Sequence, residues 1–145
     1  MRRGFEKVSG YEYVNFPKRK TKQSAGYDIE SAVNVVINPG ETKLIPTGIK
    51  AYMDENEWLG IYIRSSLAIK YGLVLANSVA VIDSDYYNNP ENEGHIMMAL
   101  RNTSGSPCAI KVGDRIAQGI FCQYYKVDDD SADGDRTGGI GSTGK

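Results

Sequence analysis

Apolar residues recur along the chain in short runs that alternate with polar residues or are rich in β-branched side chains. Runs of this length and composition are typical of buried or half-buried strands. Turn signals, such as the Asn-Pro-Gly of residues 38–40, separate them. Regular short strands with Gly and Pro between them predict an all-β sandwich or barrel. The predicted strands are 12–16, 33–38, 42–49, 58–64, 73–83, 95–102, 108–112 and 115–127.

Two segments depart from this strand pattern. Residues 65–71, SSLAIKY, begin with serines suited to capping and continue with good helix formers, which predicts one short helix. From Asp128 onward, acidic and small residues replace apolar ones, which predicts a flexible C-terminal arm. The chain is therefore expected to consist of a β domain, residues 1–127, and an arm, residues 128–145.

Composition narrows the functional classes. A chain of 145 residues is long enough for one self-sufficient domain. Its net charge of −1 argues against a general nucleic-acid binder, and no apolar run approaches the length of a membrane span. The N-terminus lacks the apolar stretch of a secretory signal, so a cytoplasmic protein is expected.

Cys108 and Cys122 lack metal-ligand spacing and are expected to be buried, reduced thiols. His95 is interpreted as a hairpin residue rather than a metal ligand or general base.

Five polar clusters interrupt the strand pattern, and each has a structural explanation when taken alone. An acid such as Asp28 often lies on the solvent face of a strand, and Arg64 with two serines often forms a simple cap and a surface charge. Arg64, Ser65 and Ser66 at a helix start also suit an anion. Asp83 near Tyr86 combines a carboxylate with an aromatic platform. The clusters are SAGYDIES (24–31), IYIRSSLAIKYGL (61–73), ANSVAVIDSDYY (76–87), KVGDRIAQGIF (111–121) and RTGGIGSTGK (136–145).

The last cluster has the glycine and lysine spacing of a phosphate-binding loop. A P-loop follows a strand, whereas the polar stretch KVDDDSADGD precedes this one, so the match fails on context. Glycine-rich backbone with Arg136, Ser142 and Thr143 can nevertheless wrap a polyphosphate.

Together and in this order, the clusters closely resemble the five motifs of the homotrimeric dUTPase family, of bacterial or phage type. The matching stretches are AGYDIES, RSSLAIKYGL, NSVAVIDSDY, GDRIAQ and RTGGIGSTG, which span residues 25–144. The resemblance implies a jelly-roll-like β barrel of the β-clip type and a homotrimer whose subunits share three active sites. It also implies hydrolysis of dUTP to dUMP and pyrophosphate, with Mg²⁺ held mainly by the triphosphate. Nucleic acid and membrane are not expected as partners.

The resemblance assigns roles to individual residues. Asp83 would be the general base that activates water for attack on the α-phosphorus. Tyr86 would lie against the deoxyribose, and a hairpin from Asn77 to Tyr86 would read uracil largely through backbone groups. The residues implied for base and sugar are Asn77, Val81, Ile82, Tyr86 and Ile140. Those implied for the phosphates are Arg64, Ser65, Ser66, Gln118, Arg136, Gly141, Ser142 and Thr143, with Asp28 near the metal through water.

Three departures from the family pattern stand out. Ile140 occupies the position of an aromatic that covers uracil, and Ala80 occupies a position that is often glycine. The stretch YYNNPENEGHI (86–96) is longer than usual, so Tyr87 or this loop is expected to supply the missing lid.

Two alternative functions remain. A dCTP deaminase shares the fold and the Arg-Ser-Ser, and a nucleotide-binding regulator would have lost turnover. The Asp83–Tyr86 spacing and Arg136 favour hydrolysis over both.

Overall fold

The computed structural model of the chain describes residues 2–141, 143 and 144. Within these residues, short strands predominate and the one α-helix is brief. No helix among them is long and apolar enough to cross a membrane. The elements are β1 (Gly4–Lys7), β2 (Tyr27–Glu30), β3 (Val35–Ile37), β4 (Thr42–Pro46), β5 (Ile49–Tyr52), β6 (Glu57–Ile63), α1 (Ser65–Tyr71), β7 (Leu73–Leu75), β8 (Ala80–Asp83), the 3₁₀ turn η1 (Ser84–Tyr86), β9 (Met97–Asn102), β10 (Cys108–Ile110) and β11 (Arg115–Gln123).

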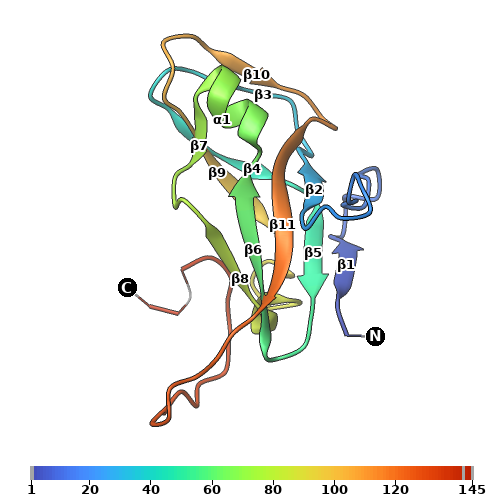
Figure 1. The fold of residues 1–145 in the computed structure, drawn as a ribbon, viewed down its shortest axis with the longest axis vertical. Helices are drawn as coiled ribbons and strands as arrows, with labels where there is room; N and C mark the ends of the chain where they lie inside the picture. Colours follow the sequence, from blue (N-terminus) through green and yellow to red (C-terminus); the bar gives the residue numbers. More distant parts are fainter. Residues whose placement is uncertain (1, 142, 145) are drawn as a thin grey trace.

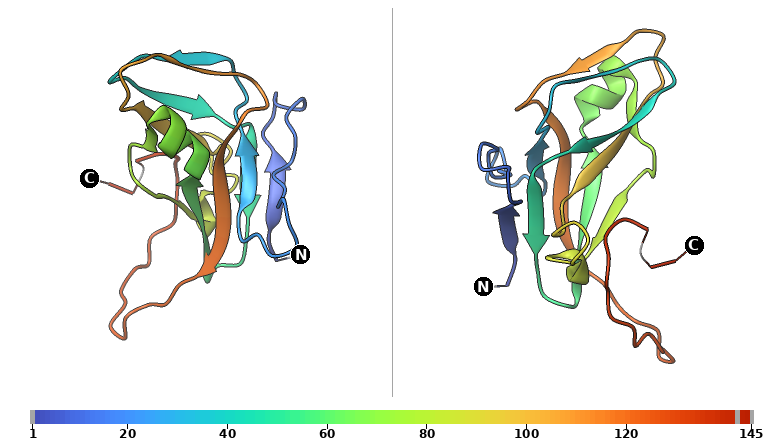
Figure 2. Two further views of the ribbon diagram at one scale, coloured as in Figure 1. Left: turned by 45° about the horizontal axis from the view of Figure 1, so that its top comes forward. Right: turned by 180° about the vertical axis from the view of Figure 1, so that it is seen from behind.

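Two antiparallel sheets form the body of the molecule. The main sheet has the strand order β2-β11-β6-β8, and the second has the order β4-β9-β7. The pairs β1-β5 and β3-β10 extend this framework. The long strand β11 runs beside β6 through the middle of the molecule, with α1 near one end (Figures 1 and 2). The predicted all-β, jelly-roll-like fold with one short helix is confirmed.

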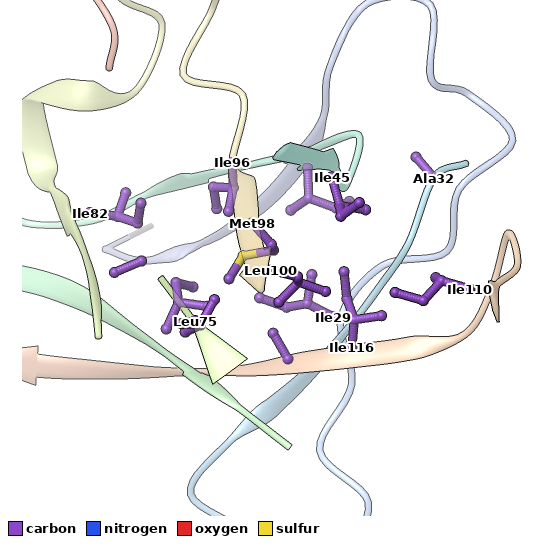
Figure 3. Packing of buried hydrophobic residues seen from close by; sticks show 14 of the residues in the cluster. Ile29, Ala32, Ile45, Leu75, Ile82, Ile96, Met98, Leu100, Ile110 and Ile116 are labelled. Carbon is purple, nitrogen blue, oxygen red and sulfur yellow. The ribbon is translucent and has the colours of Figure 1, made fainter. Parts of the chain in front are cut away.

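The core lies between the two sheets because strand residues alternate in burial. In β8, Ala80 and Ile82 are buried whereas Val81 and Asp83 are exposed. Figure 3 shows Ile82 of β8 in the same cluster as residues of the second sheet and of β11, including Met98, Leu100 and Ile116. Burying each Ile or Leu side chain contributes about 1.5–3 kcal/mol. The same alternation directs every second side chain of the main sheet outward.

The prediction of a strand at residues 12–16 is wrong. The backbone turns there, with the Val14 amide bonded to the carbonyl of Tyr11 at 3.2 Å. The Tyr13 hydroxyl donates to the Ala32 carbonyl, and Val14 is buried in the core. The N-terminal strand is instead β1, which pairs with β5. Of residues 12–16 only Val14 is buried, whereas Tyr13 and Phe16 are exposed, and turn hydrogen bonds take the place of a strand ladder.

The prediction of one strand over residues 73–83, with a hairpin from Asn77 to Tyr86, is also wrong. β7 pairs with β9 in the second sheet, whereas β8 pairs with β6 in the main sheet. The connection turns at Ser78, whose φ of 64° lies in the left-handed region. The segment therefore crosses from one sheet to the other, and β8 forms an edge of the main sheet.

The helix α1 is where the sequence predicts it, but its cap differs from the expectation. Arg64 is the N-cap residue and makes no side-chain capping bond, so Ser65 and Ser66 are the first helical residues. Gly72 ends the helix with φ of 65°, and its amide bonds to the Ala68 carbonyl. The serine hydroxyls are therefore not used as the N-cap.

His95 is a buried structural residue. Its Nε2 accepts the Gly48 amide proton at 2.8 Å, and its ring lies edge-on to Tyr11. Burial lowers the pKa of His95, although the nearby Glu93 carboxylate acts in the opposite direction. The imidazole is therefore held neutral to support the turn before β5.

We expect the free energy of unfolding to fall as the pH drops below about 6.5, where the unfolded histidine takes up a proton that the folded one does not. His95→Gln keeps an acceptor for the Gly48 amide but does not titrate. Urea unfolding of both proteins between about pH 7.5 and 5.5 tests this. Equal slopes in the two proteins over this range would contradict it.

Candidate active site

The outer face of the main sheet carries most of the polar residues singled out from the sequence. Trp58 of β6 pairs with Asp83 of β8, and Tyr62 of β6 pairs with Gln118 of β11. Gln118 pairs in turn with Asp28 of β2. Directly paired residues of antiparallel strands point to the same face. These side chains therefore share one face, at two separate ends.

The first end, which we call the cationic end, consists of Asp28, Arg64, Arg115 and Gln118. Arg115 Nη1 donates to Asp28 Oδ2 at 3.3 Å, and Arg64 Nε lies 3.9 Å from Asp28 Oδ1. The Gln118 side chain packs directly on Gly26, where any Cβ would collide with it. Ser65 is exposed and Ser66 half-buried at the start of α1. A cavity of about 500 Å³ adjoins this end and is lined by Arg64, Ser66 and Arg115 among others. The arrangement suits an anion because two guanidinium groups flank one carboxylate.

The second end, which we call the carboxylate end, consists of Asp83, Asp85 and Tyr86. The two carboxylates are about half exposed, with side-chain exposures of 52% and 58%. Tyr86 is buried, and its hydroxyl donates to the His95 carbonyl at 2.5 Å. Burial raises the pKa of Tyr86, so its hydroxyl remains a donor near neutral pH. This end thus places exposed acids beside a fixed aromatic ring.

The arm of the same chain reaches the carboxylate end. Arg136 Nη2 lies 2.7 Å from Asp83 Oδ2, and its Nε lies 2.8 Å from Asp85 Oδ1. The guanidinium also lies over the Tyr86 ring, 5.6 Å from its centroid. A cavity of about 430 Å³ here is lined by Glu57, Trp58, Val81, Asp83, Ser84, Asp85, Tyr124, Arg136 and Thr143.

The two ends are far apart within one chain. Four residues of β6 separate Trp58 from Tyr62, which corresponds to about 13 Å along the sheet. Three strand spacings separate β2 from β8, or about 14 Å across the sheet. Asp28 and Asp83 therefore lie about 20 Å apart on the same face.

The structure brings the candidate residues into two groups rather than one. At the carboxylate end lie Asp83, Tyr86, Val81, Arg136 and Thr143. At or beside the cationic end lie Asp28, Arg64, Ser65, Ser66 and Gln118.

Five candidates remain, and the structure describes four of them. Ile82 points into the core, so only its backbone is available to a ligand. Asn77 is exposed in the turn before β8, and Ile140 is 58% exposed in the arm. Gly141 has a φ of 75°, and Ser142 lies outside the described residues.

Arg115 lies with Gln118 in the fourth polar cluster, where both interrupt an apolar strand and could point into a site, but the resemblance assigns a role to Gln118 alone. Sequence reasoning missed two residues at or beside the carboxylate end. Asp85 and Trp58 were missed because their relevance depends on the arm and on strand register. Among the described residues, no three His, Cys, Asp or Glu side chains are grouped to hold a metal ion. The described side chains offer one carboxylate, Asp28, at the cationic end and two, Asp83 and Asp85, at the carboxylate end.

Comparison with known proteins identifies the family. The family model described as dUTPase matches residues 12–144. The chain belongs to the dUTPase family. It is 54% identical over 146 residues to a deoxyuridine 5'-triphosphate nucleotidohydrolase of Lactococcus lactis, which covers 98% of this chain and 97% of that protein. A protein of the same name from Haemophilus influenzae is 40% identical and covers 89% of this chain and 87% of its own length.

Solved structures of dUTPases have the same fold. The crystal structure of a dUTPase from Streptococcus mutans matches with a TM-score of 0.83 and 45% identity, covering 86% of this chain and 98% of that one. The dUTPase from phage phi11 of Staphylococcus aureus matches with a TM-score of 0.77 over 92% of this chain and 97% of its own. At 22% identity, that phage protein supports the fold alone.

The loop of residues 87–95 is longer than the link expected after Tyr86. It forms several hydrogen bonds, and two of its asparagine side chains donate to Tyr86. Asn92 Nδ2 donates to the Tyr86 hydroxyl at 2.9 Å, and Asn89 Nδ2 donates to the Tyr86 carbonyl at 2.8 Å. Asn89 also donates to Asn92 Oδ1 at 2.7 Å. The loop therefore holds the ring and the backbone of Tyr86 together.

Tyr87 faces away from the cavity beside Asp83. Its hydroxyl bonds to Glu6 Oε1 at 2.5 Å, and its ring packs against Tyr52. Lys50 lies over the same ring. Within its own chain Tyr87 is therefore not positioned as a lid over this cavity, whereas Trp58 and Tyr124 line it.

We expect Gly94→Ala to destabilise the fold by about 2–4 kcal/mol, because the substitution adds a steric collision to an unfavourable backbone conformation. Gly94 has a φ of 87°, and a Cβ there would lie 2.8 Å from the Tyr86 carbonyl oxygen. Gly10 has a φ of 88° with no atom within 4 Å of such a Cβ, so Gly10→Ala is the matched control. Urea unfolding should show a loss of only about 1 kcal/mol for the control. Equal losses for both variants would contradict the packing of Tyr86 on this loop.

Proposed function

We propose that this protein hydrolyses dUTP to dUMP and pyrophosphate. Two relatives covering most of the chain carry the name deoxyuridine 5'-triphosphate nucleotidohydrolase. The observation that carries the proposal is the exposed carboxylate of Asp83, at the end of an edge strand and next to the buried Tyr86. A water molecule and a nucleotide can both reach this carboxylate.

Asp83 acts as the general base. It takes a proton from a water molecule whose oxygen forms a bond to the α-phosphorus, while the bond from that phosphorus to the bridging oxygen of the β-phosphate breaks. Pyrophosphate leaves in line with the attacking water. The reaction needs positioning and charge neutralisation more than covalent catalysis. Arg136 supplies a positive charge next to this carboxylate.

Base and sugar are recognised by β8 and Tyr86. As an edge strand, β8 presents backbone donors and acceptors along its outer side to a planar base. Val81 points outward on the same face as Asp83, while Ile82 anchors the strand in the core. Two hydrogen bonds fix the Tyr86 hydroxyl, and we expect the ring held in this way to exclude a ribose 2'-hydroxyl. Asn77 and Ile140 border the base from the turn and the arm.

The triphosphate is bound by cationic side chains and enters with Mg²⁺. Arg64, Ser65, Ser66 and Gln118 bind phosphate oxygens, and Arg115 adds a further charge. Gly141, Ser142 and Thr143 of the arm complete the phosphate contacts together with Arg136. Two guanidinium groups already neutralise Asp28, so its carboxylate is suited to hold a metal-bound water rather than the ion itself.

The site is completed by other copies of the chain in a homotrimer. Asp83 must lie within hydrogen-bond reach of water at the α-phosphorus, yet Asp28 and its neighbours lie about 20 Å away on the same chain. One triphosphate cannot bridge that distance. A neighbouring subunit that brings its cationic end to this Asp83 resolves the mismatch. Closed rotational symmetry then makes all sites equivalent.

We expect the wild-type protein with Mg²⁺ to release pyrophosphate from dUTP, but not from dCTP, dTTP or UTP. Asp83→Asn keeps the size of the side chain but removes the base, so kcat should fall by at least about 100-fold while dUTP binding persists. Pyrophosphate and ammonia assays, with calorimetric titration of a non-hydrolysable dUTP analogue, measure this. Ammonia from dCTP would instead indicate a deaminase, and tight dUTP binding without turnover would indicate a regulator.

A mixture of inactive chains tests the shared site. Asp83→Asn and Arg64→Ala each disable a different end, and we expect each protein alone to be inactive. After co-refolding in equal amounts, about one quarter of the sites would combine an intact Asp83 with an intact Arg64 from another chain. Recovery of about a quarter of the wild-type activity is therefore expected. A mixture no more active than its components, with mixed assemblies shown by native mass spectrometry, would refute the shared site.

A further inference from the structure

Both the ring and the backbone of Tyr86 are bonded to the loop of residues 87–95. At the ring end, the hydroxyl donates to the His95 carbonyl at 2.5 Å and accepts from Asn92 Nδ2 at 2.9 Å. At the backbone end, the Tyr86 carbonyl accepts from Asn89 Nδ2 at 2.8 Å. Asn89 Nδ2 also donates to Asn92 Oδ1 at 2.7 Å. The two asparagine amides therefore close a circuit of hydrogen bonds that starts and ends on Tyr86.

The surroundings of the Tyr86 hydroxyl oppose any movement of the ring. Tyr86, Asn89 and His95 are all buried. A tyrosine hydroxyl has one proton to donate, and here it goes to the His95 carbonyl. Displacing the ring would take this partner from the carbonyl and from the Asn92 amide, and an unpaired buried polar group is unfavourable. The ring is therefore held by bonds as well as by packing.

The loop that holds Tyr86 is itself anchored to β5. Lys50 of β5 has a largely buried side chain, whose Nζ donates to Glu93 Oε2 at 2.9 Å and to Asn88 Oδ1 at 2.6 Å. The hydrogen bond from Lys50 lowers the pKa of Glu93 to about 2, so this carboxylate is ionised at neutral pH. Asn89 and Asn92 lie between these anchors and Tyr86. They are thus connected to the sheet framework on one side and to the ring on the other.

A ring that cannot move matters because the sugars of dUTP and UTP differ by a single hydroxyl group. Shape alone rejects an added hydroxyl only modestly. The rejection is limited by the free energy needed to displace the wall that the added group meets. For Tyr86 that displacement breaks the bonds to Asn92 and His95. The selectivity of such a wall therefore depends on the side chains behind it.

We propose that Asn92 is a positioning residue that sets the selectivity of the site for a 2'-deoxy sugar by holding the hydroxyl of Tyr86. The inference rests on the proposed function, in which Tyr86 lies against the sugar. Asn92 acts on the nucleotide only through Tyr86, and Asn89 orients the Asn92 amide for this contact. The loop of residues 87–95 is then a specificity element rather than the lid that the sequence leads us to expect.

Binding selectivity tests the proposal without depending on turnover. Calorimetric titration with Mg²⁺ and the non-hydrolysable α,β-imido analogues of dUTP and UTP, the weaker ligand in competition with the tighter, gives a ratio of Kd values. In Asn92→Ala we expect the UTP analogue to bind about fivefold to tenfold more tightly, the equivalent of one hydrogen bond between neutral groups. The dUTP analogue should bind with little change. An unchanged ratio, or weaker binding of the dUTP analogue alone, would overturn the proposal.

A second variant keeps the turn of the loop intact. Asn92 Oδ1 also accepts the Gly94 amide proton at 3.1 Å. A serine hydroxyl can accept the same bond, although more weakly, but is too short to reach the Tyr86 hydroxyl. Asn92→Ser should therefore relax selectivity as Asn92→Ala does, and urea unfolding of each variant shows that it is folded during the titration. Wild-type selectivity in a folded Asn92→Ser protein would contradict the proposal.

Tyr86→Phe reveals whether Asn92 acts through the hydroxyl. Phenylalanine keeps the ring but removes the group that Asn92 and His95 bond to. Asn92→Ala should then change selectivity in the wild-type protein but not in the Tyr86→Phe protein. The same change in both backgrounds would mean that Asn92 acts through another contact, such as its packing on Gly139, and the proposal would be wrong.

Glu91→Ala is the matched control within the loop. Glu91 is exposed, and its carboxylate accepts the Gly139 amide proton of the arm at 2.6 Å. Its removal disturbs the loop and this contact but leaves the hydrogen bonds of Tyr86 in place. We expect the Kd ratio of Glu91→Ala to equal that of the wild-type protein. A loss of selectivity as large as that of Asn92→Ala would indicate general loosening of the loop and would refute a specific role for Asn92.

Failure of this inference and failure of the proposed function give different results. A wild-type protein that does not hydrolyse dUTP, but whose binding selectivity falls in Asn92→Ala, would refute the hydrolysis and support the role of Asn92. A protein that hydrolyses dUTP with the same binding selectivity in every variant would do the reverse. Equal affinity of the wild-type protein for the two analogues would also rule out the inference.

Discussion

The antiparallel register of β6 with β8 and β11 determines where the polar side chains lie on the outer face of the main sheet. It places Trp58 opposite Asp83 and Tyr62 opposite Gln118, so the carboxylate end and the cationic end lie apart on one sheet face. The register itself is strongly fixed, because a slip of one residue would turn Leu59, Ile61 and Ile82 out of the core. The separation of the two ends is thus a consequence of core packing.

The same register also determines where the arm begins. β11 ends beside Glu57, at the carboxylate end, so the arm starts near the acids rather than near the cations. Two exposed carboxylates in one turn repel each other unless a cation lies between them. Arg136 supplies that cation and is in turn desolvated against Tyr86. The arm and the acidic turn therefore stabilise each other's position.

The sequence predicted the parts of the structure that depend on local pattern. Alternating burial, the helix at residues 65–71 and the five polar clusters can all be read from neighbouring residues. Pairing partners cannot, because they depend on contacts distant in sequence. For this reason the pattern predicts a strand at residues 12–16, where only Val14 is buried, and one strand at residues 73–83, where the structure has two in different sheets. Asp85 and Asn92 were missed for the same reason, since their relevance appears only when Arg136 and Gly139 lie against them.

The aliphatic Ile140 in place of an aromatic is understandable from the surroundings of Asp83. Trp58 and Tyr124 line the cavity beside this carboxylate, so the sheet and the first residue after β11 already supply flat apolar surface there. Trp58 is held in place because Gly60 leaves room for its ring, and a Cβ at residue 60 would lie 2.9 Å from Trp58 Cζ3. Two hydrogen bonds fix Tyr124: its backbone amide donates to the Asn56 carbonyl, and its hydroxyl donates to the Glu55 carbonyl. Ile140 itself is 58% exposed and is not among the residues that line this cavity, so the flat apolar surface there comes from the rigid part of the molecule. Next to it, Gly139 packs so closely on Asn92 that a Cβ there would lie 2.6 Å from Asn92 Nδ2, which leaves no room for a side chain at that position of the arm.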